Sequence, residues 1–365
     1  MKILVPYEVS TTGMKNPYLF LLLRELNKLD GIRKIQHGYG WLYEPEEWDV
    51  IHLHWPELLV KYQLADTSRT DLLEGRHFEK ALNAIRQKKR EGTRVIVTIH
   101  NEKPHKDQSG IFDQFYRDIY KLSDGFIHLG EFSGKVLENE YTDETAGKPA
   151  FTIPHGDYSF FPNGMERARC REQLNIQKHE KVLLSFGAVR SKDELELGID
   201  AFKKAGIENS IYMIAGSIPE PYRSKPEHFI VRKKLYANLF NRRIKVHEKV
   251  IASDKVQLYL KAADLVFIPR FNTLNSGNIA LGFTFGKVVI GPGYGVIGET
   301  LNKTGNPVFD PADLNSVSEA IAAGFNLAES GHGIKNKEYA NHHMQWGNIA
   351  SETLKAYQSI KPVGF

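Results

Sequence analysis

Short runs of buried-type residues alternate with helical patterns from one end of this 365-residue sequence to the other. The alternation predicts βαβ units, and hence parallel sheets with helices on both faces. In the first half the strand-like runs are 3–5, 50–54, 94–100, 125–129 and 151–154. In the second half they are 181–187, 210–216, 264–269 and 286–291.

The alternation is interrupted once, between residues 156 and 180. This segment is polar and turn-rich, with Pro162-Asn163-Gly164 at its centre, and suits a linker that carries a short helix. We therefore predict an α/β fold with two Rossmann-like, doubly wound domains, 1–160 and 161–345. Because ligands bind outside the carboxyl ends of parallel strands, we expect the two domains to face a central cleft that holds the chemistry.

Composition excludes several classes of protein. Hydrophobic residues make up 41% and charged residues 25%, as in globular proteins, and a net charge of +4 is too small to imply a nucleic-acid partner. Cys170 is the one cysteine in the sequence, and no Cys/His spacing typical of a metal site occurs. The longest apolar run, 18–23, is far below the ~18 residues that span a bilayer. We expect a cytoplasmic protein, either free or peripheral to the inner face of the plasma membrane.

In the second half, an apolar helix is predicted to begin near Gly277, after a polar loop that follows a strand. Asn275 or Ser276 can cap this helix, and its first N–H groups, including that of Asn278, are suited to bind a diphosphate. An ordinary N-cap without a ligand is the alternative interpretation.

Further positions in the second half are candidates for binding phosphate or ribose. Gly187 follows a strand and lets a ligand approach the backbone, while Arg190 or Lys192 can neutralise phosphate oxygens. Glu299 lies after a glycine-rich turn, where its carboxylate can accept hydrogen bonds from both hydroxyls of a ribose. For all of these charged residues the alternative is a solvated surface position.

Histidines and other polar residues gather near the strand ends of the first half. We predict that this set forms hydrogen bonds to sugar hydroxyls or phosphates, which in a sugar-transferring enzyme would be those of the acceptor. The alternative, metal binding, lacks the helical spacing of a zinc site. His52 and His128 lie within buried strands, and we interpret them as satisfied core histidines. The acceptor-side set is Asn16, His54, Glu57, Asn101, His105 and His155, with His100 among them.

A basic stretch between residues 232 and 249 contains seven arginines and lysines interleaved with apolar residues. It suits contact with anionic lipid, a rim that binds phosphates, or a solvated helix face.

Several segments together resemble the GT-B glycosyltransferases, particularly the GT4-like group. In the second half these segments are 264–269, 285–289 and 308–313. The first half is similar to that of bacterial exopolysaccharide and surface-polysaccharide glycosyltransferases in the segments 16–18, 52–57, 98–101, 104–105 and 154–156. The closing segment 346–360 is similar to the terminal helix that crosses back onto the first domain in GT-B proteins.

The resemblance implies that His100 lies beside the transferred sugar and that Arg190 faces the diphosphate. This sequence departs from the family pattern at three places. Asp193 stands at the aligned position of the family's lysine, and Thr273 and Leu281 stand in place of its paired glutamates.

The resemblance further implies transfer of a hexose from a nucleoside diphosphate sugar to an acceptor hydroxyl in surface or exopolysaccharide assembly. The donor is a UDP-sugar or a GDP-sugar, and the acceptor is lipid-linked or an oligosaccharide, with no metal and no cofactor. We expect a retaining reaction, in which no protein base is needed. If the reaction inverts, His100, Glu131 or Asp157 is the candidate base.

Two other functions stay open. A sugar-nucleotide epimerase or a sugar phosphorylase can be built on the same fold, because a fold does not fix its chemistry. A non-enzymatic, two-lobed sugar-binding protein is the third possibility.

Overall fold

The computed structural model describes residues 1–9, 17–102, 110–217, 242–248, 250–271 and 273–361. The chain divides into two compact units. The first unit extends to Gly156 and resumes at Trp346, and the second holds Asp157–Gln345. The sequence predicts a boundary at residue 160, and the structure has it at Gly156.

The first unit is built on a six-stranded parallel sheet in the order β2-β1-β3-β4-β5-β6. Its strands are β1 (Lys2–Val5), β2 (Lys34–His37), β3 (Val50–Leu53), β4 (Arg94–Ile99), β5 (Gly125–His128) and β6 (Ala150–Thr152). Its α-helices are α1 (Tyr18–Leu26), α2 (Leu58–Lys61), α3 (Gly75–Arg90), α4 (Asp113–Leu122), α5 (Glu131–Glu140), α6 (Thr142–Thr145) and α15 (Trp346–Ser359), and two short 3₁₀ turns cover Tyr39–Leu42 and Thr70–Leu72.

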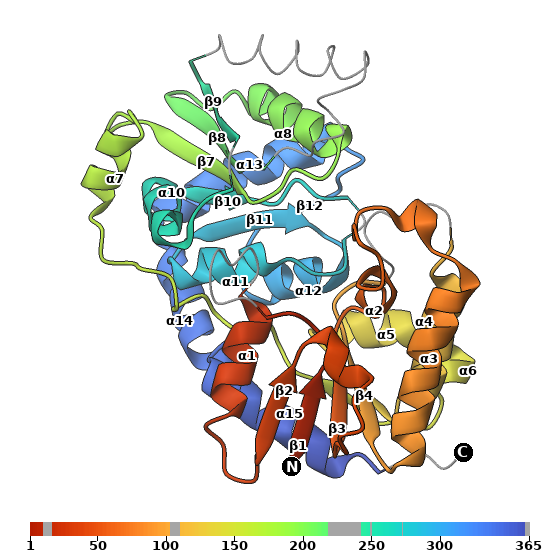
Figure 1. Cartoon of the computed structure of the whole chain (residues 1–365). Helices are drawn as coiled ribbons and strands as arrows, with labels where there is room; N and C mark the ends of the chain where they lie inside the picture. Colours follow the sequence, from red (N-terminus) through yellow and green to blue (C-terminus); the bar gives the residue numbers. More distant parts are fainter. Residues whose placement is uncertain (10–16, 103–109, 218–241, 249, 272, 362–365) are drawn as a thin grey trace. The chain divides into compact units, whose positions relative to one another are not determined.

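Helices cover both faces of this first sheet. The connection through α1 leads from β1 to one side, and the connections through α3, α4 and α5 lead to the other, so right-handed crossovers place them on opposite faces. α15 packs beside α1, although more than 300 residues of chain separate them (Figure 1). The terminal helix therefore completes the first unit.

The second unit has a six-stranded parallel sheet in the order β12-β11-β10-β7-β8-β9. Its strands are β7 (Lys181–Phe186), β8 (Ser210–Gly216), β9 (Ile244–Glu248), β10 (Leu265–Phe267), β11 (Val288–Pro292) and β12 (Val308–Phe309). Its helices are α7 (Arg167–Gln173), α8 (Lys192–Ala205), α10 (Val256–Ala262), α11 (Gly277–Thr284), α12 (Gly295–Lys303), α13 (Leu314–Glu329) and α14 (Gly333–His343), with a 3₁₀ turn at Ser253–Lys255.

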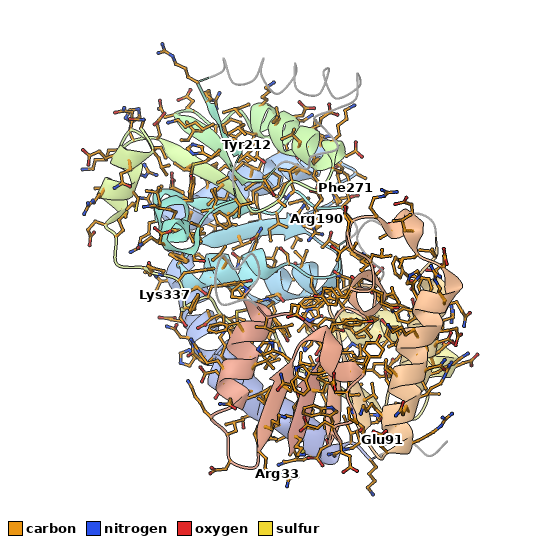
Figure 2. The ribbon with its side chains drawn as sticks, viewed as in Figure 1. Arg33, Glu91, Arg190, Tyr212, Phe271 and Lys337 are labelled. Atoms are coloured by element: carbon orange, nitrogen blue, oxygen red, sulfur yellow. The ribbon has the colours of Figure 1, made fainter. Side chains whose placement is uncertain are left out.

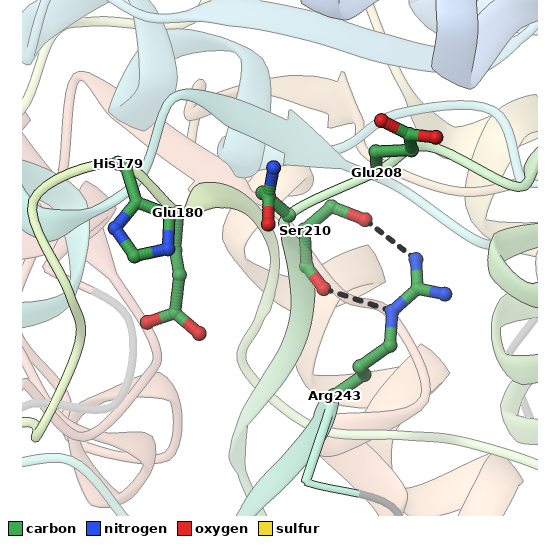
Figure 3. Close-up of a pocket in the computed structure, with 6 residues that line it drawn as sticks. His179, Glu180, Glu208, Ser210 and Arg243 are labelled. Carbon is green, nitrogen blue, oxygen red and sulfur yellow. Dashed lines mark hydrogen bonds between the residues drawn. The ribbon is translucent and has the colours of Figure 1, made fainter.

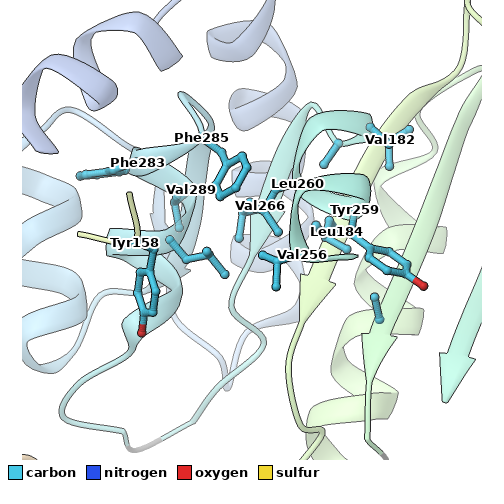
Figure 4. Packing of buried hydrophobic residues seen from close by; sticks show 14 of the residues in the cluster. Tyr158, Val182, Leu184, Val256, Tyr259, Leu260, Val266, Phe283, Phe285 and Val289 are labelled. Atoms are coloured by element: carbon cyan, nitrogen blue, oxygen red, sulfur yellow. The ribbon is translucent and has the colours of Figure 1, made fainter. Parts of the chain in front are cut away.

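Alternate residues of the second sheet supply two separate cores. Val182, Leu184 and Val266 belong to the core on the face covered by α10 and α11 (Figure 4). Leu183 and Phe267 belong to the core on the face covered by α8 and α13. The strands therefore read as continuous apolar runs, because both of their faces are buried.

Each sheet has a point where the strand order reverses, and these points fix where loops diverge. In the first sheet the reversal lies between β1 and β3, and in the second it lies between β7 and β10. Loops on either side of such a point run to opposite faces and leave room for a ligand at the carboxyl ends of the strands.

Helix α4 shows the limit of periodicity as a predictor. In the sequence, Ile111, Phe112, Phe115, Ile119 and Leu122 recur at three- and four-residue intervals, which predicts an amphipathic helix with one buried face. Phe115, Ile119 and Leu122 are buried as expected. Ile111, part of the same pattern, precedes the helix and is 39% exposed. Within the described residues, none of the helices is long and apolar enough to cross a membrane.

Candidate functional site

The carboxyl edge of the first sheet gathers aromatic rings around Tyr18, the first residue of α1. The ring of Tyr18 meets those of His54, His100 and His155 edge-on, with centroids 5.7, 4.9 and 5.1 Å away. Trp346, the first residue of α15, contacts the same ring at 5.3 Å. Three of the histidines predicted from the sequence thus lie in one cluster.

His54 and His100 are joined directly within this cluster. His54 Nδ1 and His100 Nε2 are 3.0 Å apart, and since each neutral imidazole carries one N–H, one ring donates and the other accepts. Trp55 stacks on His100 with ring centroids 4.5 Å apart. These contacts fix the orientation of His100 at the end of β4, where 8% of its surface is exposed.

Hydrogen bonds to Tyr7 hold the backbone of His54 and Trp55, the part of the cluster that follows β3. The Tyr7 hydroxyl, just after β1, accepts the backbone N–H groups of His54 and Trp55 at 3.0 and 3.1 Å. Tyr7 therefore ties together the two strands at the reversal of the first sheet. His52 is fully buried, and its two ring nitrogens bond to the hydroxyls of Tyr357 and Thr98, each at 2.7 Å.

His52 and the buried His128 are the core histidines that the sequence predicts. His128 Nδ1 lies 2.9 Å from the Ser133 hydroxyl.

Burial keeps these histidines neutral. Desolvation lowers the pKa of His52 to about 3 and that of His155 to about 4. The pKa values of His54 and His100 are also lowered well below the usual range by burial and by neighbouring histidines. A neutral imidazole can accept or donate a hydrogen bond, as binding of a sugar hydroxyl requires.

Glu57, another acceptor-side candidate, begins helix α2. It is buried and accepts a hydrogen bond from the Tyr116 hydroxyl at 2.6 Å. Burial raises the pKa of its carboxyl.

In the second unit, the loop after β7 reaches the carboxyl edge through Gly187. This residue has φ of +98°, a conformation that glycine adopts without strain. The loop leads to α8, whose N-cap Ser191 accepts the Glu194 N–H at 3.2 Å. Arg190 lies between Gly187 and this cap (Figure 2).

A buried ion pair joins the first turn of α8 to the loop after β10. Glu194 and Arg270 are 6% and 8% exposed, and Arg270 Nη1 donates to Glu194 Oε2. The same carboxylate oxygen accepts the Arg190 N–H at 2.7 Å. Burial and the charge of Arg270 lower the pKa of Arg190 to about 10, so the Arg190 guanidinium remains charged at neutral pH.

The start of α11 lies against the same edge. Ser276 is its N-cap and accepts the Asn278 N–H at 3.3 Å. The Asn278 side chain donates to the Phe186 carbonyl at the end of β7, at 2.8 Å. Of the two caps that the sequence allows, Ser276 is therefore the one used, and Asn275 precedes it.

A pocket of about 370 Å³ opens at the amino edge of the second sheet, the edge opposite to Gly187 and Ser276 (Figure 3). Its lining is His179, Glu180, Glu208, Asn209, Ser210 and Arg243. Arg243 is held there by Ser210, whose carbonyl and hydroxyl accept its N–H groups at 3.1 and 2.9 Å.

Similarity to solved structures covers nearly the whole chain. Sucrose-phosphate synthase from Thermosynechococcus elongatus matches with a TM-score of 0.71 at 13% identity, over 98% of each chain. A glycosyltransferase from Rickettsia africae matches at 0.64 with 14% identity, over 98% of this chain and 97% of the other. Anabaena HepE in complex with UDP and glucose matches at 0.68 with 12% identity, over 99% of this chain and all of the other.

The chain has the GT-B fold. The resemblance to GT-B glycosyltransferases that the sequence motifs indicate is thereby confirmed.

A sequence relative points in the same direction as this GT-B fold. The chain is 26% identical over 248 residues to a GDP-mannose:glycolipid 4-beta-D-mannosyltransferase of Xanthomonas campestris pv. campestris. The match covers 67% of this chain and 61% of the relative, so the chain spans about three fifths of the curated relative's length. The enzyme of a second strain of that organism matches equally. No protein-family model matches the chain.

Some predicted residues of this GT-B chain lie apart from the two clusters. Lys192 begins α8 and pairs with Glu196 at 3.9 Å on an exposed face. Glu299 is half-buried in α12, and Glu131 is the exposed first residue of α5. Asn101 is half-buried just beyond β4.

Asp157 occupies a structural position at the start of the second unit. It is 3% exposed, its carboxylate accepts the Gln345 side-chain N–H at 2.8 Å, and its own N–H donates to the Met344 carbonyl at 2.7 Å. These contacts tie together the two points where the chain passes between the units.

Asn16, His105 and most of the basic stretch from 232 to 249 lie outside the described residues. Within the part of the chain that is described, no group of three or more histidine, cysteine or acidic side chains is placed to hold a metal ion.

Tyr18 and Trp346 enter the sequence analysis only as members of the segments 16–18 and 346–360, with no role of their own, and Glu194 and Arg270 do not enter it. Arg270 carried a recognisable signal, since it is a cation directly after a buried strand. The contact between Tyr18 and Trp346 could not be predicted, because it depends on the packing of α15 against α1.

Proposed function

We propose that this protein is a glycosyltransferase that moves a hexose from a nucleoside diphosphate sugar to a hydroxyl of a lipid-linked or oligosaccharide acceptor. The sequence similarity to a GDP-mannose:glycolipid mannosyltransferase carries this proposal. The paired arginines at the carboxyl edge of the second sheet support it, because a diphosphate needs cationic partners there. By the same similarity, a role in bacterial surface or exopolysaccharide assembly is proposed.

GDP-mannose is the donor that the similarity favours. A UDP-sugar is the alternative, since the HepE structure contains UDP. With either donor, negative charge develops on the diphosphate as it departs. Fixed cations and N–H dipoles stabilise this charge and so lower the barrier to sugar transfer. Arg190 and the first N–H groups of α11, from Gly277 onward, are assigned to this task without a metal or a cofactor.

The stereochemical outcome follows from the anomer of the product. The mannose of GDP-mannose is α-linked, so the retaining reaction that we expect gives an α-mannoside. The beta linkage in the relative's name would require inversion and a base. Of the three candidate bases, His100 is buried in the aromatic cluster, whereas Glu131 is exposed and Asp157 is bonded to Gln345. The neutral ring of His100 can take a proton, but its lowered pKa makes it a weak base, so all three residues stay candidates for an inverting reaction.

An acceptor attached to lipid would bring the enzyme to a membrane surface. We propose peripheral contact with the inner face of the plasma membrane through the basic stretch from 232 to 249, in a cytoplasmic protein. Acceptor binding is assigned to the first unit, around His54, Glu57 and His155.

The test is transfer of radiolabelled sugar from GDP-mannose or UDP-glucose into a bacterial lipid extract, with the free nucleotide measured in parallel. We expect transfer from one donor, and nuclear magnetic resonance of the product gives the anomer. A chain that changes the sugar nucleotide without any acceptor would instead be an epimerase. A chain that binds neither nucleotide would contradict the proposal.

The matched variants are Arg190→Ala and Lys204→Ala. Arg190→Ala should weaken GDP or UDP binding at least about tenfold, since a hydrogen bond to a charged group contributes roughly 1.5–3 kcal/mol. Lys204, on the exposed side of α8, should be replaceable without effect. Unchanged affinity in Arg190→Ala would remove Arg190 from the site.

A further inference from the structure

Trp55 occupies a place at the carboxyl edge of the first sheet where a ligand is expected. It is the second residue after β3, and the strand order of this sheet reverses between β1 and β3. A reversal point is where open α/β sheets bind their ligands. The diphosphate of the donor is assigned to the second unit, so the ligand that remains for this edge is the acceptor.

The backbone and the ring of Trp55 are both held in place. Its N–H donates to the Tyr7 hydroxyl at 3.1 Å, and its carbonyl accepts the Leu58 N–H at 3.0 Å. Pro56 follows, and a residue before proline is confined to an extended backbone. The indole stacks on the ring of His100, with centroids 4.5 Å apart and an angle of 21° between the planes. The ring is therefore ordered before a ligand meets it, which lowers the entropy lost on binding.

Trp55 differs from the other three tryptophans of the chain in what it leaves to the solvent. Trp48 and Trp346 are 4% and 5% exposed, and Trp41 is 36% exposed with its ring beside the Lys34 ammonium. Trp55 is half-buried, and within the described residues no group accepts a hydrogen bond from its indole N–H. Unlike the buried indole N–H of Trp48, this donor is open to solvent and is available to a ligand.

A fixed, half-buried indole with a spare donor matches the chemistry of a sugar ring. A pyranose presents C–H groups on its faces and hydroxyls around its rim, so a face can pack on the indole while a hydroxyl accepts the indole N–H. A lipid chain would cover the same surface and leave the N–H without a partner, which costs free energy. The donor therefore favours a saccharide over a lipid chain as the occupant.

We propose that Trp55 binds a sugar ring of the acceptor by stacking, with its indole N–H donating to a hydroxyl of that ring. This inference rests on the proposed function and deepens it, because it names the saccharide, and not the lipid chain, as the part of the acceptor that the first unit recognises.

The test measures transfer from the active donor, GDP-mannose or UDP-glucose, into a dilution series of the bacterial lipid extract. The extract concentration that half-saturates the rate is compared for wild type, Trp55→Phe, Trp55→Leu and Trp41→Leu. Trp41 is the matched control, since it is an exposed tryptophan of the same unit whose ring contacts Lys34. Calorimetry with GDP and UDP measures nucleotide binding by the same proteins.

For Trp55→Leu we expect the half-saturating concentration to rise about tenfold or more, because the stacking contact and the hydrogen bond are both lost. Trp55→Phe keeps an aromatic face but lacks the N–H, so its value should fall between those of the wild type and Trp55→Leu. Trp41→Leu should match the wild type. Nucleotide affinity should be unchanged in all three variants.

Competition separates the sugar from the lipid. Mild acid splits the extract into water-soluble saccharides and a lipid residue, and each fraction is added to the transfer reaction of the wild type and of Trp55→Leu. The saccharides should inhibit the wild type, and Trp55→Leu should need about tenfold more of them for the same inhibition. Saccharides that inhibit neither protein, or a lipid residue whose inhibition depends on Trp55, would overturn the assignment to a sugar ring.

An unchanged half-saturating concentration in Trp55→Leu would overturn the proposal. Equal losses in Trp55→Phe and Trp55→Leu would also overturn it, because stacking would then contribute nothing, and so would a parallel loss of nucleotide affinity. If Trp55→Leu does not fold, Trp55→Phe decides, and failure of both variants to fold would assign Trp55 to stability. A wild type that binds no nucleotide and transfers no sugar would instead contradict the proposed function, and this inference with it.

Discussion

At the scale of the residue, the most unusual feature is a set of histidines held neutral by burial. His52 is the clearest case, since it is fully buried and both of its ring nitrogens are hydrogen-bonded to hydroxyls. Such a pair of bonds satisfies the neutral ring but offers no counter-charge to a protonated one. Burial lowers the pKa of His52 from 6.5 to about 3.

This shift makes stability depend on pH. Because the folded pKa is depressed, the unfolded chain binds the proton first, so the stabilisation is complete above pH 6.5 and is lost as the pH falls towards 3. At about 1.36 kcal/mol per pKa unit, protonation linked to His52 should lower the free energy of unfolding by roughly 2 kcal/mol between pH 6.5 and pH 5. Urea unfolding of wild type and His52→Gln at both pH values measures it. The variant should lose less stability on acidification, and an equal loss in both proteins would contradict this account.

Single residues also mark how far the sequence could predict the site. Gly187, Arg190, Ser276 and Asn278 follow predicted strand ends, and the structure places them at the carboxyl edge of the second sheet. Arg270 could have been included on the same reasoning. The partnership of Arg270 with Glu194 could not, because it depends on the order of β7 and β10 in the sheet.

At the scale of the element, the contact between Gly156 and α15 is the tightest constraint in the first unit. A Cβ built on Gly156 would lie 2.1 Å from the ring of Trp346, which is 5% exposed. A glycine is therefore required where the chain passes beneath the first turn of α15. The same turn contains Gly347, around which a Cβ would meet no atom within 4 Å.

These two glycines form a matched pair of variants. Gly156→Ala should displace Trp346 and destabilise the first unit by about 1–3 kcal/mol, as overpacked cores do. Gly347→Ala should cause no loss, since alanine favours the helix. Thermal unfolding monitored by tryptophan fluorescence distinguishes them. Equal stability of Gly156→Ala and wild type would show that the ring can move away at no cost.

The sequence predicted helices and strands more completely than it predicted individual site residues. The helix predicted to begin near Gly277 begins there, the linker carries a short helix as predicted, and the terminal helix expected at 346–360 covers Trp346–Ser359. The error at Ile111 has a physical cause, because an apolar period continues past the residue where the helical backbone begins.

At the scale of the whole molecule, the chain consists of two doubly wound units, one of them discontinuous. The first unit has the strand order 2-1-3-4-5-6 and the second has the order of a dinucleotide-binding sheet, with its first and fourth strands adjacent. Alternating strand and helix patterns indicate such units but leave the order of the strands open. The strand order decides which loops lie next to one another. The sequence alone therefore could not predict which residues make up each cluster.

The central claim is that a nucleoside diphosphate binds at the carboxyl edge of the second sheet. A crystal structure of the protein with GDP or UDP tests it most directly. We expect the diphosphate within hydrogen-bonding distance of Arg190 and of the first N–H groups of α11. A nucleotide bound elsewhere, for example in the amino-edge pocket beside Arg243, would contradict the account.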